Sequence, residues 1–568
     1  MDSNFMHDLQ SYETVVKKGL DELNKEKIIE RIWSKDYTVW GNKPDEISNR
    51  LGWLDSPDQT TNFLGEIREF ADSIKGGRFK NALLLGMGGS SLAPEVFRNI
   101  FGVRPGYPDL AVLDSTDPSA VMKFTKDFDP SETLYIVSTK SGGTVETLSF
   151  LKYFYNYALT KIGKEHSSKH FIAITDPGSG LEALAKKLKF RKIFLNNPDI
   201  GGRYSALSLF GIVPAAIIGV DVKRILDKAA EEACACGKPG CKSAGSNRGA
   251  VLGTIIGELS IHQRDKLTFI NSGELKYFGA WIEQLIAEST GKNGKGILPV
   301  DGEALLKPDF YTDDRIFVYM HLTGDSTMDK AVSDLKNAGN PVIEIVLRDL
   351  YDIGKEFFCW EFATAVAGWR IGIQPFDQPN VESAKIIARK MVKEFSEKGK
   401  LPETQPALEE HGIKIYGEFN DNSLKDILLN CLNVKLIGGK RTYIALQAFI
   451  TPDEKTTDLL QEIRTKIRNK FKLATTAGYG PRFLHSTGQL HKGDSGNGIF
   501  IQFIANINED IRIPDDPESE KSSISFGILL HAQAMGDRQA LLDNNRKIIT
   551  IDLGSDVLGN LKYIISLL

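Results

Sequence analysis

The 568-residue chain carries 70 Lys and Arg against 74 Asp and Glu, so its formal net charge is only −4, and its 41% hydrophobic residues suffice for a core. This balance excludes a general attraction to nucleic acid or to an anionic membrane, so an anionic ligand needs a local site. Because no apolar stretch reaches the roughly 18 residues that span a bilayer, and the beginning lacks a secretory pattern, we expect a cytoplasmic protein.

The first 260 residues alternate between short apolar runs and helical patterns. Residues 1–50 read as mainly helical, and the clearest later helix is VETLSFLKYFYNYALTKI at 145–162. This alternation predicts a parallel sheet with helices on both faces. The predicted strands are NALLL (81–85), DLAVLD (109–114), TLYIVST (133–139), HFIAIT (170–175) and KIFLN (192–196).

A second alternation begins near residue 265 and a third region follows a Gly- and Pro-containing linker, FSEKGKLPETQP. The predicted fold class is α/β, with two doubly wound parallel sheets and a C-terminal α/β region. The expected divisions are 1–50, 51–260, 261–400 and 401–568. The strands expected after residue 260 are LTFIN, IFVYMHL and PVIEIVL in the second sheet, and TYIALQAFI, IFIQFIANI and KIITIDL in the third region.

Two loops that follow predicted strands could hold a phosphate. Gly86–Ser91 exposes backbone N–H groups before a helix, where the helix dipole favours an anion, and it includes Gly89 and Ser90. It lacks the third glycine of a dinucleotide loop and the GK[ST] of a nucleotide P-loop, so it could also be a plain connection. The second loop, STKSGGTVET, offers a richer set of donors: Thr139, Lys140, Ser141, Thr144 and Thr147. Helix capping explains one or two of these hydroxyls.

Glu288 is the candidate catalytic base. It continues the apolar face of Phe278, Trp281 and Leu285, and lies where the helix meets Ser-Thr-Gly. The negative end of the helix dipole and partial burial both strengthen a carboxylate as a base, which suits proton removal beside a carbonyl. The alternative is an exposed glutamate at a frayed helix end.

Further polar residues could complete the same site. Arg203, before an apolar helix, could stabilise an oxyanion or merely hold loop carbonyls. Gln378 lies in a proline-bracketed turn and Lys385 on the next helix. His485 and His491 share a Gly-rich loop and suit acid–base chemistry better than a shared metal, because six residues do not place them on one helix face.

The cysteine cluster CACGKPGC holds Cys234, Cys236 and Cys241. A metal site would need a fourth ligand, and none has suitable spacing, so we favour reduced thiols at a helix end. The expectation is therefore that the protein binds no metal.

Together, these motifs resemble the phosphoglucose isomerase family, most closely the isomerase half of transaldolase/glucose-6-phosphate isomerase fusions. The matching segments run from about 80 to about 500 and are LLLGMGGSSLAPEVF, STKSGGTVET, GGRYSALS, ESTGKNGKGILPV, PFDQPNVESAK and GYGPRFLHSTGQLHKG. No stretch is large enough for a separate transaldolase barrel. The resemblance implies two sheets of sugar-isomerase type with an active site between them. The family often completes that site with a second subunit, which leaves a homodimer open.

The resemblance also implies a role for each candidate residue, without cofactor or metal. Arg203 matches the arginine that stabilises the enediolate, Glu288 the proton-shuttling base, and Gln378 and Lys385 the substrate-contacting Gln and the Lys that assists ring opening. The ring-opening His of the family lies between Glu and Lys, whereas here the best local match is His485, with His491 as a second candidate. His321 has the expected order but lacks the surrounding pattern. The residues that match phosphate- or substrate-holding positions are Gly89, Ser90, Thr139, Lys140, Ser141, Thr144 and Thr147.

We therefore expect an aldose–ketose isomerase that interconverts glucose 6-phosphate and fructose 6-phosphate through an enediolate. A dual phosphoglucose/phosphomannose isomerase would carry much the same residues. A non-catalytic sugar-phosphate sensor would need the hydroxyl-rich loops but not Glu288, Arg203 and Lys385, so the retention of all three favours the enzyme.

Overall fold

A computed structural model describes residues 4–241, 247–402 and 404–568. Its first sheet has the order β3-β2-β4-β5-β6, and neighbouring strands are parallel throughout. The core residues of β2, Ala82 to Leu85, are fully buried, as expected for a strand covered on both faces. The five predicted strands of this sheet are confirmed as β2 (Asn81–Gly86), β3 (Asp109–Leu113), β4 (Thr133–Ser138), β5 (Phe171–Thr175) and β6 (Lys192–Leu195).

Helices connect and cover these strands. The longest of them, α7 (Val145–Ile162), has the bounds that the sequence pattern predicts. The others in this part of the chain are α3 (Ser56–Thr61), α4 (Leu64–Ile74), α5 (Leu92–Phe101), α6 (Pro118–Asp127), α8 (Lys164–Ser167), α9 (Gly180–Lys187), α10 (Leu209–Ile217) and α11 (Val222–Ala235).

The second sheet has the order β1-β10-β9-β7-β8. Its three predicted strands are present as β7 (Lys266–Asn271), β9 (Arg315–Leu322) and β10 (Val342–Leu347), and β8 (Leu298–Val300) extends the parallel set. The antiparallel edge strand β1 (Phe5–Asp8) was not expected in a mainly helical beginning. Such a four-residue strand carries too little alternation to reveal itself, whereas the helices α1 (Glu13–Lys25) and α2 (Ile28–Trp33) fit the prediction.

Long helices cover the second sheet. The central pair is α12 (Arg248–Ile261) and α15 (Ile353–Ile371). Their backbones approach closely at Gly253, which has no Cβ; a Cβ there would lie only 2.3 Å from the carbonyl oxygen of Ala363. The helix that the sequence predicts through Phe278 to Glu288 divides into a 3₁₀ turn, η9 (Gly273–Phe278), and α13 (Gly279–Thr290). The other helix beside this sheet is α14 (Asp329–Asn337), whereas α16 (Val381–Lys398) packs against α20 (Phe526–Asp543) of the C-terminal region.

The third sheet has the order β11-β12-β20-β17-β15-β16, with β20, β17, β15 and β16 parallel. The predicted strands appear as β15 (Tyr443–Phe449), β17 (Gly498–Ile504) and β20 (Lys547–Asp552), joined by β16 (Ala474–Tyr479) and the edge pair β11 (Leu408–Glu410) and β12 (Ile413–Tyr416). The predicted linker starts within α16, and its residue 403 lies outside the described residues. The helices are α17 (Leu424–Leu432), α18 (Glu454–Phe471), α19 (Gly488–Gly493), α20 (Phe526–Asp543) and α21 (Val557–Leu567).

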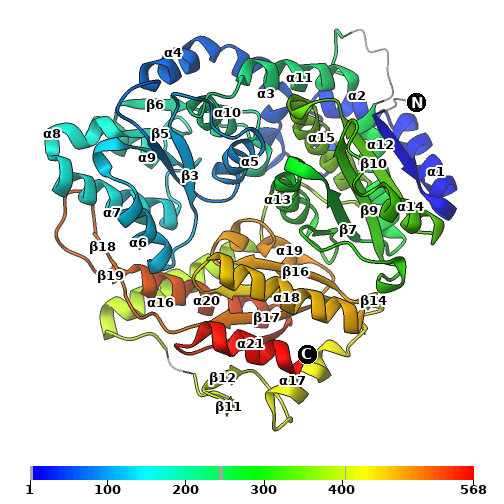
Figure 1. Ribbon diagram of the computed structural model, residues 1–568. Coiled ribbons are helices and arrows are strands. Elements are labelled where there is room, and N and C mark those ends of the chain that lie inside the picture. The colour runs from blue at the N-terminus through cyan, green and yellow to red at the C-terminus, as the bar shows by residue number, and fades with distance from the viewer. Residues whose placement is uncertain (1–3, 242–246, 403) are drawn as a thin grey trace.

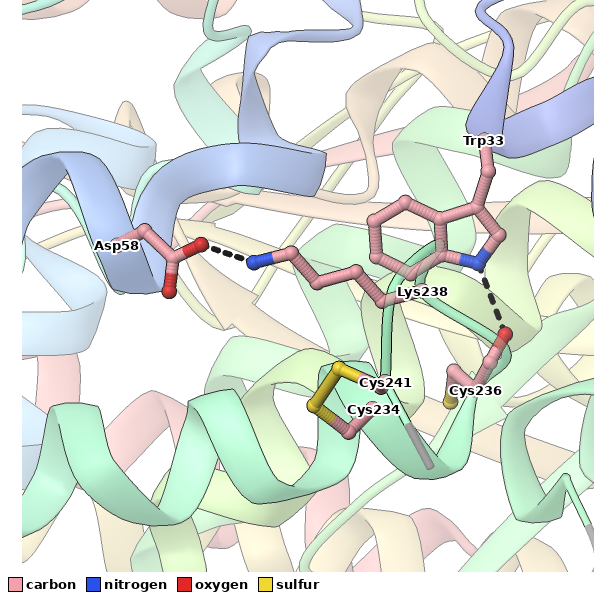
Figure 2. The surroundings of a disulfide bond; sticks show 6 residues. All are labelled: Trp33, Asp58, Cys234, Cys236, Lys238 and Cys241. Carbon is pink, nitrogen blue, oxygen red and sulfur yellow. Dashed lines mark hydrogen bonds and ion pairs between the residues drawn. A yellow bond between two sulfur atoms is a disulfide. The ribbon is translucent and has the colours of Figure 1, made fainter. Parts of the chain in front are cut away.

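The cysteine cluster corrects one expectation. Cys234 and Cys241 form a disulfide at the end of α11, so the prediction of reduced thiols is wrong for these two (Figure 2). The turn between them brings their Cα atoms to 5.4 Å, within the range for a disulfide. Cys236 stays free and buried, and its carbonyl oxygen accepts a hydrogen bond from Trp33 Nε1 at 2.9 Å. The rarity of cysteines in the whole chain had argued only against a framework of many bridges, not against one local pair.

Each of the three large sheets forms one unit with its helices, and the three units surround a common centre (Figure 1). At this centre α13 of the second unit lies close to α19 of the third. Within the described ranges, no helix combines the length and the apolarity needed to cross a bilayer.

A partly buried charge cluster occupies the seam between the units. Burial, reinforced by the nearby carboxylate of Asp301, raises the pKa of Glu283 on α13 to about 8, although Arg464 and Arg482 oppose this shift. The folded state therefore holds a proton that the unfolded chain loses above its ordinary pKa of 4.5. Stability from this group is fully present below that pH and declines as pH rises toward 8.

We expect Glu283→Gln to remove this decline. At pH 8 the free energy of unfolding of the variant should exceed that of the parent protein by on the order of a few kcal/mol, because one pKa unit corresponds to ~1.4 kcal/mol. The variant should therefore unfold at a higher temperature at this pH. At pH 4 to 5 the difference should vanish. Thermal unfolding at both pH values measures this, with the exposed Glu274→Gln as the control. An equal difference at both pH values would contradict the assignment.

Candidate active site

One cavity of about 560 Å³ gathers eleven of the twelve sequence-predicted site residues. It lies at the carboxyl ends of β2 and β4, where open parallel sheets bind ligands, and faces the end of α13. The predicted residues that line it are Gly89, Ser90, Thr139, Lys140, Ser141, Thr144, Arg203, Glu288, Gln378, Lys385 and His485.

Glycines shape the first loop, between β2 and α5. Gly88 has a left-handed backbone (φ +55°), and a Cβ on Gly89 would overlap the carbonyl oxygen of Gly202 at 1.9 Å. The loop thus packs directly against the turn that carries Arg203. Ser90 lines the cavity from this loop.

The hydroxyl groups of the second loop contact one another and the loop backbone, and the residues that carry them line the cavity. Thr144 occupies the N-cap position of α7 but makes no capping hydrogen bond, and its Oγ1 lies 3.0 Å from Thr139 Oγ1 instead. Ser141 Oγ accepts a hydrogen bond from the Gly143 N–H at 3.2 Å. Capping therefore does not account for these residues, and their hydroxyls face a space that could hold an anion.

Lys140 and Thr147 differ from the simple expectation. Lys140 Nζ lines the cavity but is paired with Asp176, and it also donates to the Pro198 carbonyl oxygen at 2.6 Å, so it does not offer a free charge. Thr147 is fully buried one turn into α7 and does not line the cavity. Its spacing in the motif does not bring its hydroxyl to the cavity wall.

Glu288 lies near the last turn of α13, and its side chain is 13% exposed. Its Oε1 is 3.3 Å from Arg203 Nη1, and its Oε2 accepts a hydrogen bond from Gln284 Nε2 at 3.0 Å. The same Gln284 amide donates to the His485 carbonyl oxygen at 2.8 Å, so one side chain ties the carboxylate to the loop of the third unit. The carboxylate is held in place while one face stays open to the cavity.

Arg203 is 3% exposed, and its guanidinium donates four hydrogen bonds to neighbouring residues. Its Nε donates to Ser289 Oγ at 2.8 Å and its Nη1 to Gln378 Oε1 at 3.0 Å. Its Nη2 donates to the carbonyl oxygens of Pro375 and Asp377 at 2.7 and 2.9 Å. Arg203 therefore both holds loop carbonyls and presents its charge to the cavity, so the two readings of the sequence are compatible.

His485 reaches the cavity from the 3₁₀ turn η12 (Arg482–His485) of the third unit. Its Nε2 lies 3.0 Å from Glu146 Oε1 on α7. Burial raises the pKa of Glu146, but the charge and hydrogen bond of His485 outweigh it, so the net pKa is lowered and the carboxylate stays ionised. An ionised carboxylate only accepts, so Nε2 carries a proton and Nδ1 is left for a ligand.

The other two histidines lie elsewhere. His491 is 2% exposed and does not line the cavity, and burial first, then the charges of Lys492 and Arg546, lower its pKa well below the ordinary value. His321 lies near the end of β9, stacked on Tyr319, and does not line the cavity. Lys385, by contrast, lines the cavity from α16 and makes no hydrogen bond or ion pair with any residue that the structure describes.

Sequence reasoning missed Glu146 and Gln284. Glu146 belongs to the STKSGGTVET motif, and this membership could have indicated a role in the site. Its partner His485, however, is 339 residues away in sequence. Gln284 lies one turn before Glu288 on the same helix face, so the i, i+4 spacing could have indicated their contact. Among the described residues, no group of three or more His, Cys, Asp or Glu could hold a metal ion.

The fold and cavity define a class: an α/β protein whose cavity combines two glycine- and hydroxyl-rich loops at strand ends with a carboxylate, an arginine and a histidine. A family model described as Phosphoglucose isomerase matches residues 54–300. The chain is 32% identical over 389 residues to the "Probable glucose-6-phosphate isomerase" of Methanococcus maripaludis, covering 61% of this chain and 85% of that one. The chain therefore belongs to the phosphoglucose isomerase family, which confirms the resemblance inferred from its motifs.

Other relatives agree. The glucose-6-phosphate isomerase of Carboxydothermus hydrogenoformans is 27% identical over 391 residues, covering 59% of this chain and 83% of that one. A crystal structure of a glucose-6-phosphate isomerase from Chlamydia trachomatis has a TM-score of 0.58 at 18% identity, covering 69% of this chain and 89% of that chain. The latter supports the fold, and the predicted α/β fold class of sugar-isomerase type is confirmed. Because the family model ends at residue 300, the assignments of Lys385 and His485 depend on geometry.

Proposed function

We propose that this chain interconverts glucose 6-phosphate and fructose 6-phosphate through an enediolate. The observation that carries the proposal is that Glu288 and the hydroxyl-rich loop at 139–144 line the same cavity. A volume of about 560 Å³ accommodates a phosphorylated hexose.

The substrate phosphate binds the two loops at the strand ends. The backbone N–H groups of Gly88 and Gly89, together with the hydroxyls of Ser90, Thr139, Ser141 and Thr144, provide neutral donors. Lys140, already paired with Asp176, orients the loop and adds only part of its charge. The sugar then extends toward α13.

His485 and Lys385 open the cyclic sugar. The carboxylate of Glu146 keeps the proton on His485 Nε2, so Nδ1 faces the substrate and exchanges the proton that ring opening moves between the ring oxygen and the anomeric hydroxyl. Lys385, which lacks an ion-pair partner among the described residues, supplies a cation beside the sugar oxygens.

Glu288 then removes the proton from carbon 2 and delivers it to carbon 1. The electron pair of the broken C–H bond forms a double bond between carbons 1 and 2, the π pair of the carbonyl moves onto oxygen 1, and the Arg203 guanidinium stabilises the resulting enediolate. An electron pair on oxygen 2 then forms the ketose carbonyl, the pair of the carbon–carbon double bond takes the proton from Glu288 at carbon 1, and the hydroxyl proton of oxygen 2 shifts to oxygen 1. Gln378, bonded to Arg203, orients the arginine toward the substrate.

A coupled assay of fructose 6-phosphate to glucose 6-phosphate, with a chelator present, tests the proposal. We expect turnover that the chelator does not change, with exchange of the carbon-2 proton in heavy water. Mannose 6-phosphate in the same assay separates a single from a dual specificity. Binding of the sugar phosphates without proton exchange would instead identify a non-catalytic sensor.

A further inference from the structure

A buried chain of hydrogen bonds lies behind His485. Thr116 Oγ1 donates to Gln533 Oε1 at 2.7 Å, and Gln533 Nε2 donates to Glu146 Oε1 at 2.7 Å. The same Glu146 oxygen faces His485 Nε2 at 3.0 Å. Thr116, Gln533 and Glu146 are 0%, 5% and 4% exposed. Side chains from α20 and η12 thus meet at one oxygen atom of Glu146 on α7, and Thr116 extends the chain behind Gln533.

Hydrogen-bond donation along this chain has one stable direction, from Thr116 through Gln533 to Glu146. An ionised carboxylate accepts but cannot donate, so Gln533 must turn its amide nitrogen toward Glu146. A flipped amide would place two oxygens against each other in a buried space, where an unmade bond is costly. The Thr116 hydroxyl completes the arrangement by donating to the other end of the amide.

We propose that Gln533, on α20, is a positioning residue for ring opening: it fixes the carboxylate of Glu146 and thereby the orientation and protonated nitrogen of His485. This inference rests on the proposed function. Gln533 does not line the sugar cavity and acts only through Glu146.

Gln533 also limits how tightly Glu146 holds the histidine proton. Both donors share Glu146 Oε1, so each weakens the other's bond to it. The other charged groups around this pair are Lys385 and the ion-paired Glu382 and Arg389 from α16, Lys492 paired with Asp537 between α19 and α20, and Asp114 with Arg482 near the His485 ring. None of them donates to Glu146 Oε1 in the hydrogen bonds of the described residues, so the amide is the neutral donor that balances His485.

The test replaces Gln533 by methionine, which keeps the length of the side chain. A smaller residue would enlarge a second cavity of about 320 Å³ that Gln533, Glu146 and His485 already line. We expect Gln533→Met to lower kcat/KM for glucose 6-phosphate by about 10-fold, a fraction of what general acid–base catalysis contributes. The pH profile of kcat/KM should move to higher pH, because the carboxylate of Glu146 has lost a competing donor.

Binding of 5-phospho-D-arabinonate, an acyclic acid that resembles the enediolate, separates positioning from general damage, because it needs no ring opening. Its inhibition constant should change by less than about 2-fold in Gln533→Met, because the variant alters only the His485–Glu146 pair that opens the ring. Gln502→Met is the matched control: Gln502 is equally buried, donates to the Ala534 carbonyl oxygen on the same helix α20 and accepts from Thr550. Its pH profile should match that of the parent protein.

Each other outcome is decisive. If His485→Asn lowers kcat/KM and spares binding of the acyclic acid while Gln533→Met changes neither kcat/KM nor the pH profile, the role of Gln533 is wrong and the proposed function stands. If His485→Asn itself has no effect on turnover, the assignment of ring opening to His485 is wrong.

Equal loss of acyclic-acid binding and turnover in Gln533→Met would mean that Gln533 has a purely structural role. Thr116→Val should shift the pH profile in the same direction by a smaller amount.

Discussion

Glu288→Gln is expected to lower kcat by about 10⁴-fold, at or above the upper end of what a general base contributes, because one carboxylate makes both proton transfers. This corresponds to about 5 kcal/mol of lost transition-state stabilisation. The amide keeps the size of the carboxylate but only one oxygen, so it can accept from Arg203 or from Gln284 and not from both, while the shape of the cavity persists. The dissociation constant of fructose 6-phosphate, measured by calorimetry, should remain within about 3-fold, since ground-state binding does not need the base.

The exposed Glu274→Gln, on the 3₁₀ turn that precedes α13, serves as the control and should retain full turnover. Loss of carbon-2 proton exchange in Glu288→Gln identifies the missing step as the chemistry itself. A variant that lost turnover and sugar-phosphate binding together would show that Glu288 holds the ligand, and the catalytic assignment would have to be abandoned.

Much of the fold follows from local patterns in the sequence. Strands such as Asn81–Gly86 are apolar on both faces, and long helices such as Val145–Ile162 begin and end where their patterns do. The parts that were missed are short or unusual. The strand Phe5–Asp8 pairs with Val342–Leu347 across more than 300 residues, a partner that its own four residues do not specify. The Cys234–Cys241 pair depends on the shape of one turn.

The site was predictable where its residues lie on one element or follow strand ends. Glu288 extends the apolar face of its helix, and Thr139 and Ser141 follow β4, so their common cavity agrees with the rule for parallel sheets. Thr147 belongs to the same motif, but one helical turn carries it beneath the surface. The His485–Glu146 contact joins the third unit to the first, and no local pattern encodes such packing.

Arg203→Lys is expected to lower kcat by about 10²–10³-fold, the usual cost of removing a donor that stabilises an oxyanion. Lysine keeps the charge, but a single ammonium cannot replace a planar fork that donates in three directions. In particular it cannot hold Ser289, Gln378 and the Pro375 carbonyl oxygen at once. The enediolate would then meet a cation that is neither fixed in position nor directed at its oxygens, while the substrate ground state loses less.

Some loss of stability should accompany this change, since carbonyl oxygens of Pro375 and Asp377 lose buried donors. Arg464→Lys separates the two effects. Arg464 is 2% exposed and its Nε donates to the Thr475 carbonyl oxygen at 2.6 Å, but it does not line the sugar cavity. It should lower the unfolding temperature and leave kcat near that of the parent protein. If Arg203→Lys kept more than about a tenth of the kcat, the guanidinium would be a scaffold for the 375–378 turn, and stabilisation of the enediolate would have to come from elsewhere in the cavity.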